Sequence, residues 1–418
     1  MSSHPLRLVL VCSLFAAVPG ADVLVVDAAL GPGADHDTIQ GAVDAAEDGD
    51  TILVRDGNYA SFSIQAKGLV VVADGDGVFL DGHTTSNFGT RTEIEDLAAD
   101  QEVVLRGLRM NYGIRIQQCE GRVWLDEIDV EGAFGVCPLG SAPGLTVSRS
   151  DAVVLSRSRF VGETNTPTVV WAPMPSDGMS AILSTVVAHD CVFVGGDGAN
   201  SDADPFFGLP ANGACGASVS SATVTFVGCS LFGGAGGILS SDPCNSYSIG
   251  GAGLEVKSGA IVHAAATTAN GGVANLSPLC PGAFGPAGPD VANAGTVVPL
   301  PGFARSSSSD GPVRGGEVVS LVVEGQPADV PVLLASSAQA RTLVTGTTGA
   351  FLLELPHEDL FVLPPLDASG RATLSFAVPN VGRSIGAATY YLQAVFVDAT
   401  PSVWLGAGTT VTLLDASF

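Results

Sequence analysis

Charged residues recur at matching positions in three similar segments of the chain. The segments read VVLRGLRMN (103–111), VWLDEIDVE (123–131) and VVLSRSRFV (153–161). Their alignment places Asp129 between Arg109 and Arg159. A carboxylate held between two guanidinium groups could bind an anionic sugar or join proton abstraction, with arginine as the base. Opposite charges on neighbouring strands also stabilise stacking without any chemistry, so the alignment predicts an outward-facing column but leaves its role open.

The same alignment predicts two further charge pairs. Arg106 falls beside Asp126, and Glu127 falls beside Arg157. We expect these side chains to face outward as well.

Three acidic residues crowd one Gly-containing stretch: Asp197, Asp202 and Asp204. Carboxylate oxygens on a flexible loop are ligands that Ca²⁺ accepts, so this loop is a candidate calcium site. Its spacing matches no EF-hand or toxin-repeat pattern, and a solvated acidic loop is the alternative interpretation. The six histidines show no zinc-ligand spacing. No other cofactor is expected.

Eight cysteines are present, and seven remain when Cys12 in the N-terminal segment is set aside. Cys191 and Cys229 fall in one column of successive repeats, where we favour two buried thiols over a disulfide. The expected disulfides join Cys119 with Cys137 and Cys215 with Cys244. Cys280 is then the odd thiol, and a Cys244–Cys280 pair is the rival.

These residues need a repeating scaffold to position them, and the sequence contains one. Five segments share apolar residues at alternating positions and lead into Gly-containing turns, and a sixth, weaker copy follows Leu254, which predicts stacked strands. The core columns expected from them are Leu108, Ile128, Ser158, Cys191, Cys229 and Ala266, and Met110, Val130, Phe160, Phe193, Leu231 and Thr268.

Uneven spacing between the repeats predicts loops that leave after the same turn each time. The loops are 133–143, 163–177, 197–215 and 235–252. They carry a large share of the chain's few aromatic residues: Phe134, Trp171, Phe206, Phe207 and Tyr247. Loops from one corner of successive repeats lie side by side, so these rings could form a binding face, or could only pack the loops onto the scaffold.

Composition narrows the class of protein. Of 418 residues, 46% are hydrophobic, which excludes a disordered chain, and 53 glycines suit many strands and turns. The formal charge of −25 argues against a nucleic-acid or anionic-membrane partner.

The first twenty residues are typical of an export signal. Arg7 precedes an apolar run from Leu8 to Val18, which is too short to span a bilayer. We therefore expect a secreted or cell-surface protein. No later stretch is long and apolar enough to cross a membrane.

Residues 38–54, TIQGAVDAAEDGDTILV, begin with apolar residues at helical spacing and end in a strand-like run after Gly49. Asp37 is the expected N-cap. Together with Gly57 and Tyr59, this segment resembles the opening of right-handed parallel β-helix proteins, the pectate-lyase-like superfamily that includes pectin methylesterases. The resemblance implies that the helix caps the N-terminal end of the solenoid. It brings no catalytic residues, since the paired aspartates of the esterases have no counterpart here.

The domain prediction follows from these patterns. Residues 1–20 form the signal, 21–275 a right-handed parallel β-helix, 276–316 a Pro/Gly/Ser-rich linker and 317–418 a small antiparallel β-sandwich with seven strand-like runs.

We expect a monomer that binds polysaccharide or another surface component without a catalytic set. The alternatives are a lyase or hydrolase acting on acidic polysaccharide through the Asp129 neighbourhood, and a purely structural surface protein.

Overall fold

Most of the described chain forms β-strands. The computed structural model describes residues 21–82, 91–132, 142–164, 175–198, 211–237, 248–273, 286–343, 350–354, 359–378, 382, 385–398 and 402–418. The chain divides into two units. Leu24–Ala304 is called the parallel unit below, and Arg305–Phe418, with the residues up to Val23, is the antiparallel unit.

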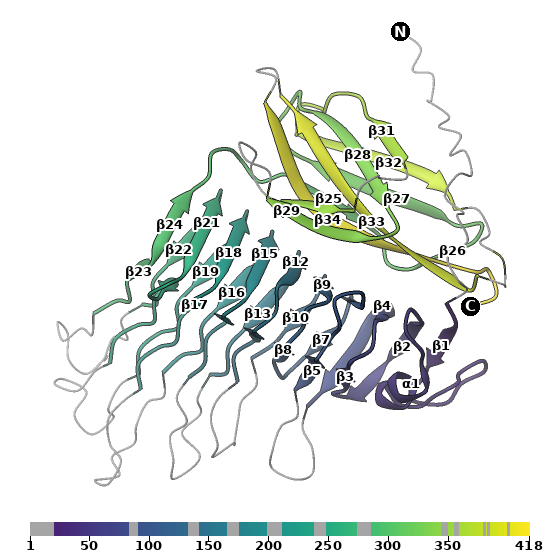
Figure 1. The fold of residues 1–418 in the computed structure, drawn as a ribbon, viewed down its shortest axis with the longest axis horizontal. Coiled ribbons are helices and arrows are strands. Elements are labelled where there is room, and N and C mark those ends of the chain that lie inside the picture. Colours follow the sequence, from purple (N-terminus) through teal and green to yellow (C-terminus); the bar gives the residue numbers. More distant parts are fainter. Residues whose placement is uncertain are drawn as a thin grey trace. The chain divides into compact units, whose positions relative to one another are not determined.

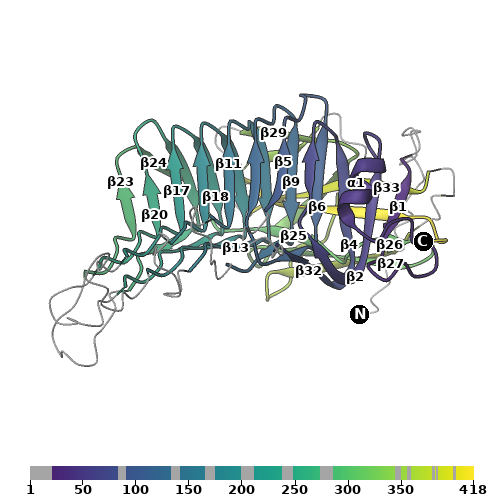
Figure 2. The same cartoon turned by 90° about the horizontal axis from the view of Figure 1, so that it is seen from below.

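In the parallel unit the chain passes repeatedly through three sets of parallel strands (Figures 1 and 2). Set A comprises β4 (Leu69–Asp81), β6 (Glu102–Arg106), β9 (Arg122–Asp126), β12 (Ala152–Ser156), β15 (Thr185–His189), β18 (Thr223–Val227), β21 (Ile261–Ala265) and β24 (Thr296–Pro299). Set B comprises β7 (Arg109–Met110), β10 (Asp129–Val130), β13 (Arg159–Val161), β16 (Val192–Val194), β19 (Ser230–Phe232) and β22 (Thr268–Asn270). Set C comprises β3 (Ser63–Gln65), β5 (Thr92–Glu95), β8 (Ile114–Gln117), β11 (Leu145–Ser148), β14 (Met179–Ile182), β17 (Ala217–Ser220), β20 (Leu254–Val256) and β23 (Val291–Asn293). β1 (Val23–Val26) and β2 (Thr51–Ala60) precede them, and β2 pairs with both β1 and β4.

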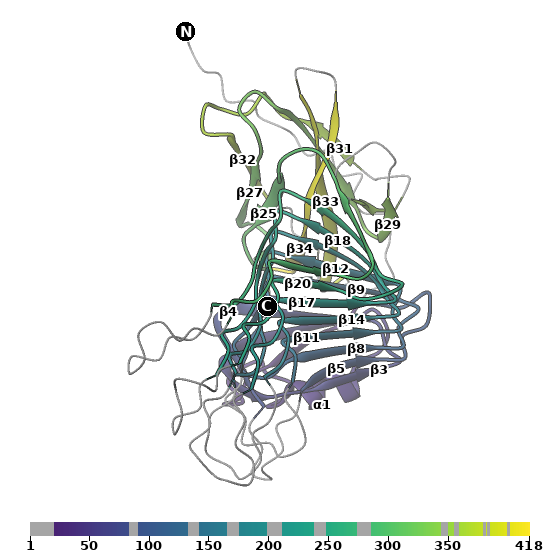
Figure 3. The same ribbon diagram turned by 90° about the vertical axis from the view of Figure 1, so that its left-hand side faces the viewer.

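Each strand pairs with the strands one repeat before and one repeat after it. Set C shows this order, with β8 between β5 and β11 and each later strand following in turn (Figure 3). One pass through the three sets is called a rung below. Because the described strands of these sets pair with strands of adjacent rungs, the unit is built by nearest-neighbour stacking.

Two of the three corners of a rung turn at a single left-handed residue. Between sets C and A these are Ala66, Asp96, Gln118, Arg149, Leu183 and Ser221, with φ between 48° and 58°. Between sets A and B they are Gly107, Glu127, Arg157, Asp190, Gly228 and Ala266. A left-handed backbone at a residue other than glycine costs about 1–2 kcal/mol, so the stacking on either side holds these corners in place.

The core of the parallel unit confirms the predicted columns over most of their length. Val130 pairs with Met110 and Phe160, and Phe193 pairs with Leu231. The rings of Phe160 and Phe193 stack with centroids 5.5 Å apart. In the last rung the prediction is wrong by one residue, because Leu231 pairs with Ala269 and Thr268 pairs with Ser230.

Helix α1 (Ile39–Ala45) precedes the first full rung and packs against β2 and β3. Ile39, Ala42 and Val43 are buried in the core of the parallel unit. The N-cap is Thr38, whose hydroxyl accepts a hydrogen bond from the Gly41 amide, and not the expected Asp37. A threonine at this position satisfies one of the free amides of the first turn.

The antiparallel unit contains ten strands in its described residues: β25 (Ser306–Ser309), β26 (Val313–Arg314), β27 (Val318–Glu324), β28 (Val330–Ser336), β29 (Gln339–Leu343), β30 (Ala350–Leu353), β31 (Asp359–Val362), β32 (Arg371–Ala377), β33 (Ala387–Val397) and β34 (Val403–Leu414). Seven of them follow the order β31-β28-β33-β34-β25-β27-β32. Their pairings are antiparallel except those of β34 with β25 and β26. The seven strand-like runs predicted between residues 317 and 418 correspond to β27, β28, β29, β30, β32, β33 and β34, and β31 was not predicted.

Strands also occupy the stretch that composition assigns to a linker. β23 and β24 complete a further rung of the parallel unit, while β25 and β26 belong to the antiparallel unit. Ser306–Ser309 is extended because Ser307 and Ser309 are buried and their hydroxyls bond the β34 backbone. In the described part of the chain, no helix has the length and apolarity needed to cross a membrane.

Candidate functional site

The predicted column of Arg109, Asp129 and Arg159 is present on β7, β10 and β13. Asp129 is the direct partner of both arginines across the sheet. Its oxygens lie 3.8 Å from Arg109 Nε and 3.3 Å from Arg159 Nη1, and Glu131 accepts a 2.9 Å bond from Arg109. The two arginine side chains are about half exposed. Exposed pairs of this kind contribute about 0–1 kcal/mol each, as expected for a ladder between strands.

The column of Arg106 and Asp126 is buried, which corrects the expectation that these two side chains face outward, whereas the side chain of Glu127 is 36% exposed. Arg106 pairs with Asp126 on the neighbouring strand, and both side chains are at most 2% exposed. Asp126 also forms a short ion pair with Arg157, and Glu127 bridges Arg106 and Arg157 at 3.3 Å. The column continues through Ser156 and His189 in the next two rungs. Buried charges require such pairing, because an unpaired one would keep its full desolvation cost.

His189 is fully buried in this column. Burial lowers its pKa to about 4, so the ring is neutral at pH 7. Neither ring nitrogen has a hydrogen-bond partner among the described residues. Sequence reasoning missed this histidine, since its only signal was its place in the repeat alignment.

The third corner of the rungs, between sets B and C, is built from glycine. Outgoing and returning segments are bonded by a continuous series of backbone hydrogen bonds, each 2.7–3.0 Å long. Each amide bonds the carbonyl of the residue before it in the series Ser176, Gly196, Ala214, Gly234, Gly251, Gly272 and Gly288. We call Gly195–Gly196, Gly213–Gly216, Gly233–Gly234, Gly250–Gly253, Gly271–Gly272 and Gly288 the glycine corner.

No side chain fits at the glycines of this corner, although Ala214, Cys215 and Ala252 stand between them. A Cβ on Gly251 would lie 1.8 Å from the Ala214 carbonyl oxygen, and one on Gly272 would lie 1.8 Å from that of Gly234. These glycines do not have positive φ, so close approach of backbones is what requires them. As at the axis of collagen, only glycine is small enough.

Two of the four predicted loops, 197–215 and 235–252, begin and end at the glycine corner, and the loops 133–143 and 163–177 connect the same two sets in earlier rungs. The segments between sets B and C whose residues are not described are 133–141, 165–174, 199–210, 238–247 and 274–285. The five predicted ligand-binding aromatics, Phe134, Trp171, Phe206, Phe207 and Tyr247, lie outside the described residues. What the structure does establish is the backbone base on which consecutive loops begin and end.

A small cluster of titratable groups lies where set C begins. Asp177 accepts a 2.9 Å bond from the Cys215 amide, and Glu255 lies 3.1 Å from Lys257 Nζ. Burial, and then the charge of Glu255, raise the pKa of Asp177. Burial and the two carboxylates raise the pKa of Cys215 to about 12, so this thiol stays protonated. The two carboxylates therefore have different environments. Burial raises the pKa of Asp177, whereas Glu255 is paired with Lys257.

The four described cysteines are free thiols. Cys191 and Cys229 are both buried, which confirms the preference for thiols in that column. Cys119 is a buried thiol whose Sγ lies 3.6 Å from the Ile94 carbonyl inside the core, and Cys215 is also free, so both differ from the predicted disulfides. Their expected partners, Cys137 and Cys244, lie outside the described residues.

Of the three predicted calcium ligands, only Asp197 is described. Its carboxylate accepts a 2.7 Å bond from the Ala235 amide in the next rung, which fixes the start of its loop. Asp202 and Asp204 lie outside the described residues. Within the part of the chain that the structure describes, no cluster of His, Cys, Asp and Glu has the geometry of a metal site.

Comparison with known proteins gives no family assignment. No protein-family model matches the chain, and no curated protein matches it significantly. The function proposed below therefore rests on the site's own geometry.

Proposed function

We propose that the chain is an exported, right-handed parallel β-helix protein with a C-terminal β-sandwich, and that it binds polysaccharide through the loops between sets B and C. The three-set strand order and the TIQGAVDAAEDGDTILV segment support the β-helix, which has the architecture of the pectate-lyase-like superfamily. Helix α1 then serves as the N-terminal cap of the solenoid, since it packs on the first strands of two sets.

The observation that carries this proposal is the hydrogen-bond series of the glycine corner. It fixes the bases of successive loops one rung apart, about 4.8 Å. A row of loops at regular spacing suits a linear polymer better than a compact ligand. The formal charge of −25 favours a neutral glycan, because an anionic one would be repelled unless cations bridged it.

Retention on immobilised glycans tests the binding function. We expect a neutral polysaccharide to retain the full chain, and the double variant Trp171→Ala/Phe207→Ala to bind at least about tenfold more weakly, since aromatic rings dominate such contacts. Phe232→Ala is the matched control, because Phe232 is an exposed ring of β19 outside the loops. Equal retention of the double variant and the control would contradict a loop site.

Two further outcomes of the same assay test the calcium site and the purely structural role. Loss of retention in EDTA would support calcium in the loop that contains Asp197, Asp202 and Asp204. Absence of retention on every glycan, together with absence of turnover, would favour a purely structural surface protein.

A second candidate function, glycan hydrolysis, is favoured by the Asp177–Glu255 cluster. Two carboxylates in different environments are what an acid–base pair requires, and the raised pKa of Asp177 suits a general acid. Release of reducing ends that Asp177→Asn abolishes and Asp129→Asn preserves would establish it. Unsaturated products lost in Asp129→Ala would instead support a lyase at the Arg109–Asp129–Arg159 column.

A further inference from the structure

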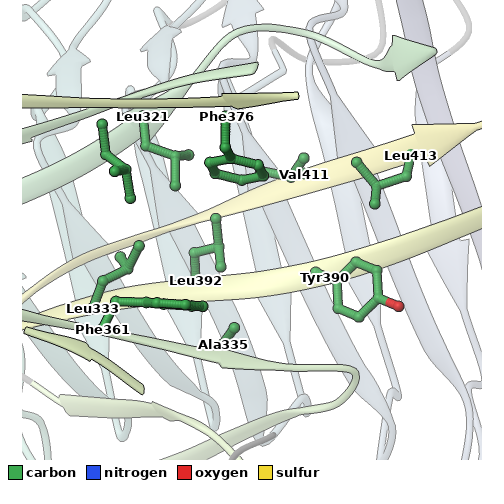
Figure 4. A pocket seen from close by; sticks show the side chains of 10 residues that line it. Leu321, Leu333, Ala335, Phe361, Phe376, Tyr390, Leu392, Val411 and Leu413 are labelled. Carbon is green, nitrogen blue, oxygen red and sulfur yellow. The ribbon is translucent and has the colours of Figure 1, made fainter. Parts of the chain in front are cut away.

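The antiparallel unit encloses an apolar pocket between its strands. Leu321 and Phe376 lie on one side of the space, and Leu333 and Phe361 lie on the other (Figure 4). The residues come from β27, β32, β28 and β31, so both halves of the strand order contribute.

The lining offers almost no polar group to a ligand. None of the ten side chains is charged, and the hydroxyl of Tyr390 is the one polar side-chain group among them. The empty space between them is about 490 Å³, part of it open to solvent. Within it, about 50 Å³ can hold the centre of a water-sized sphere. This exceeds the ~10–15 Å³ that one water molecule requires, and protein interiors are normally packed without such a space.

The pocket opens at the edge of the unit. β31 and β32 are the two ends of the strand order, and they contribute Phe361, Leu374 and Phe376 to the lining. These three side chains are only partly buried, whereas Leu321 and Leu333 deeper in the unit are 1% exposed. An apolar molecule could therefore enter between the two edge strands.

We propose that this pocket binds an uncharged aliphatic chain. A sugar would leave its hydroxyl groups without hydrogen-bond partners, and an ionised group would lose its hydration without compensation. An aliphatic chain has no hydrogen bonds or charge hydration to lose, and each methylene that leaves water makes the free energy of binding more favourable. The antiparallel unit thus recognises a ligand of different chemistry from the glycan proposed for the parallel unit.

Binding of linear alkanols to the full chain tests this proposal. Displacement of the neutral fluorophore N-phenyl-1-naphthylamine by 1-hexanol, 1-octanol and 1-decanol gives the affinities. We expect saturable displacement, with affinity rising about fourfold for each added methylene until the pocket is full.

Two alanine-to-methionine variants locate the site. Ala335 lines the pocket, so Ala335→Met fills it and is expected to weaken decanol binding at least about tenfold. Ala372 belongs to the same core but does not line the pocket, so Ala372→Met should bind as the wild type does. Thermal unfolding confirms that both variants are folded. If Ala335→Met does not fold, Leu333→Ala, which enlarges the pocket, should move the optimum to longer alkanols.

The possible results separate clearly. Affinity that depends on chain length, and that is lost in Ala335→Met or shifted in Leu333→Ala, establishes the site. Absence of saturable binding to the folded wild type, affinity independent of chain length, or unchanged binding in these pocket variants would overturn it.

Discussion

The corners of a rung are constrained in two different ways. At Glu127, Arg157 and Leu183 the chain turns within one residue, and the constraint is conformational, because φ is positive at each of them. At the glycine corner the backbone is not left-handed, and the constraint is steric, because a neighbouring carbonyl occupies the place of a side chain. A tight turn thus tolerates almost any side chain at a modest cost, whereas the glycine positions of the wider corner tolerate none.

Adding a methyl group inside the glycine corner should have the largest effect. We expect Gly251→Ala to lower the free energy of unfolding by at least about 4 kcal/mol, or to prevent folding, because the Cβ would meet the Ala214 carbonyl oxygen at 1.8 Å. Denaturant unfolding of the full chain measures this. Gly311→Ala is the control, since a Cβ there meets nothing within 4 Å. A Gly251→Ala chain as stable as the control would contradict the steric constraint at the glycine corner.

The charge columns beside these corners should differ in the same sense. Asp126→Asn removes the fully buried carboxylate that lies between Arg106 and Arg157 and leaves them only the partly exposed Glu127, and we expect a loss of about 3–5 kcal/mol. Asp129→Asn, in the exposed column, should cost less than about 1 kcal/mol. Urea unfolding of the two variants side by side is the measurement, and equal losses would show that the two columns have equivalent environments.

The buried column should also make stability depend on pH. The folded-state pKa of His189 is about 4, below the ordinary 6.5, so the unfolded chain takes up the proton first as pH falls. Stability from this group is therefore complete above pH 6.5 and declines by about 3 kcal/mol between pH 6.5 and 4. His189→Val should remove this part of the acid destabilisation, since valine occupies the same column at Val227. Parallel stability–pH curves for wild type and variant would contradict it.

The smallest effect is expected at a left-handed corner. Leu183 has φ 50° and is half exposed, so Leu183→Gly relieves strain but gives the unfolded chain more freedom. We expect a net gain of up to about 1 kcal/mol. Its control, Ile182→Gly in β14, should lose about 1 kcal/mol because a strand residue gains nothing from glycine. A loss of stability in Leu183→Gly as large as that in Ile182→Gly would contradict the conformational constraint at the left-handed corners.

Alternation of apolar residues was enough to predict the rungs and the register of Asp129 with both arginines. The predicted register of the last rung was wrong by one residue because Thr268 and Ala269 are both small, and the apolar alternation there is weak. Alternation also shows which face of a strand a residue occupies, but not whether that face is covered, and so Asp126 and Arg106 were expected at the surface.

The corners could be predicted less well. Glu127, Arg157 and Leu183 carry no signature of a left-handed turn, because stacking rather than residue type imposes it. The glycines between sets B and C were interpreted as turn residues, although they do not have positive φ and are required by close approach of backbones. Their signal was their recurrence in successive repeats, and only the contact between backbones from different rungs explains it.

The glycine corner has a consequence for how such a protein can change over time. The hydrogen bonds of the series from Ser176 to Gly288 join main-chain atoms alone, so this series does not depend on what any loop contains. A loop can therefore lengthen, shorten or be exchanged for another while the foundation beneath it is preserved. Ligand preference and scaffold stability are thereby inherited separately, and the same property makes this corner suitable for grafting foreign recognition segments.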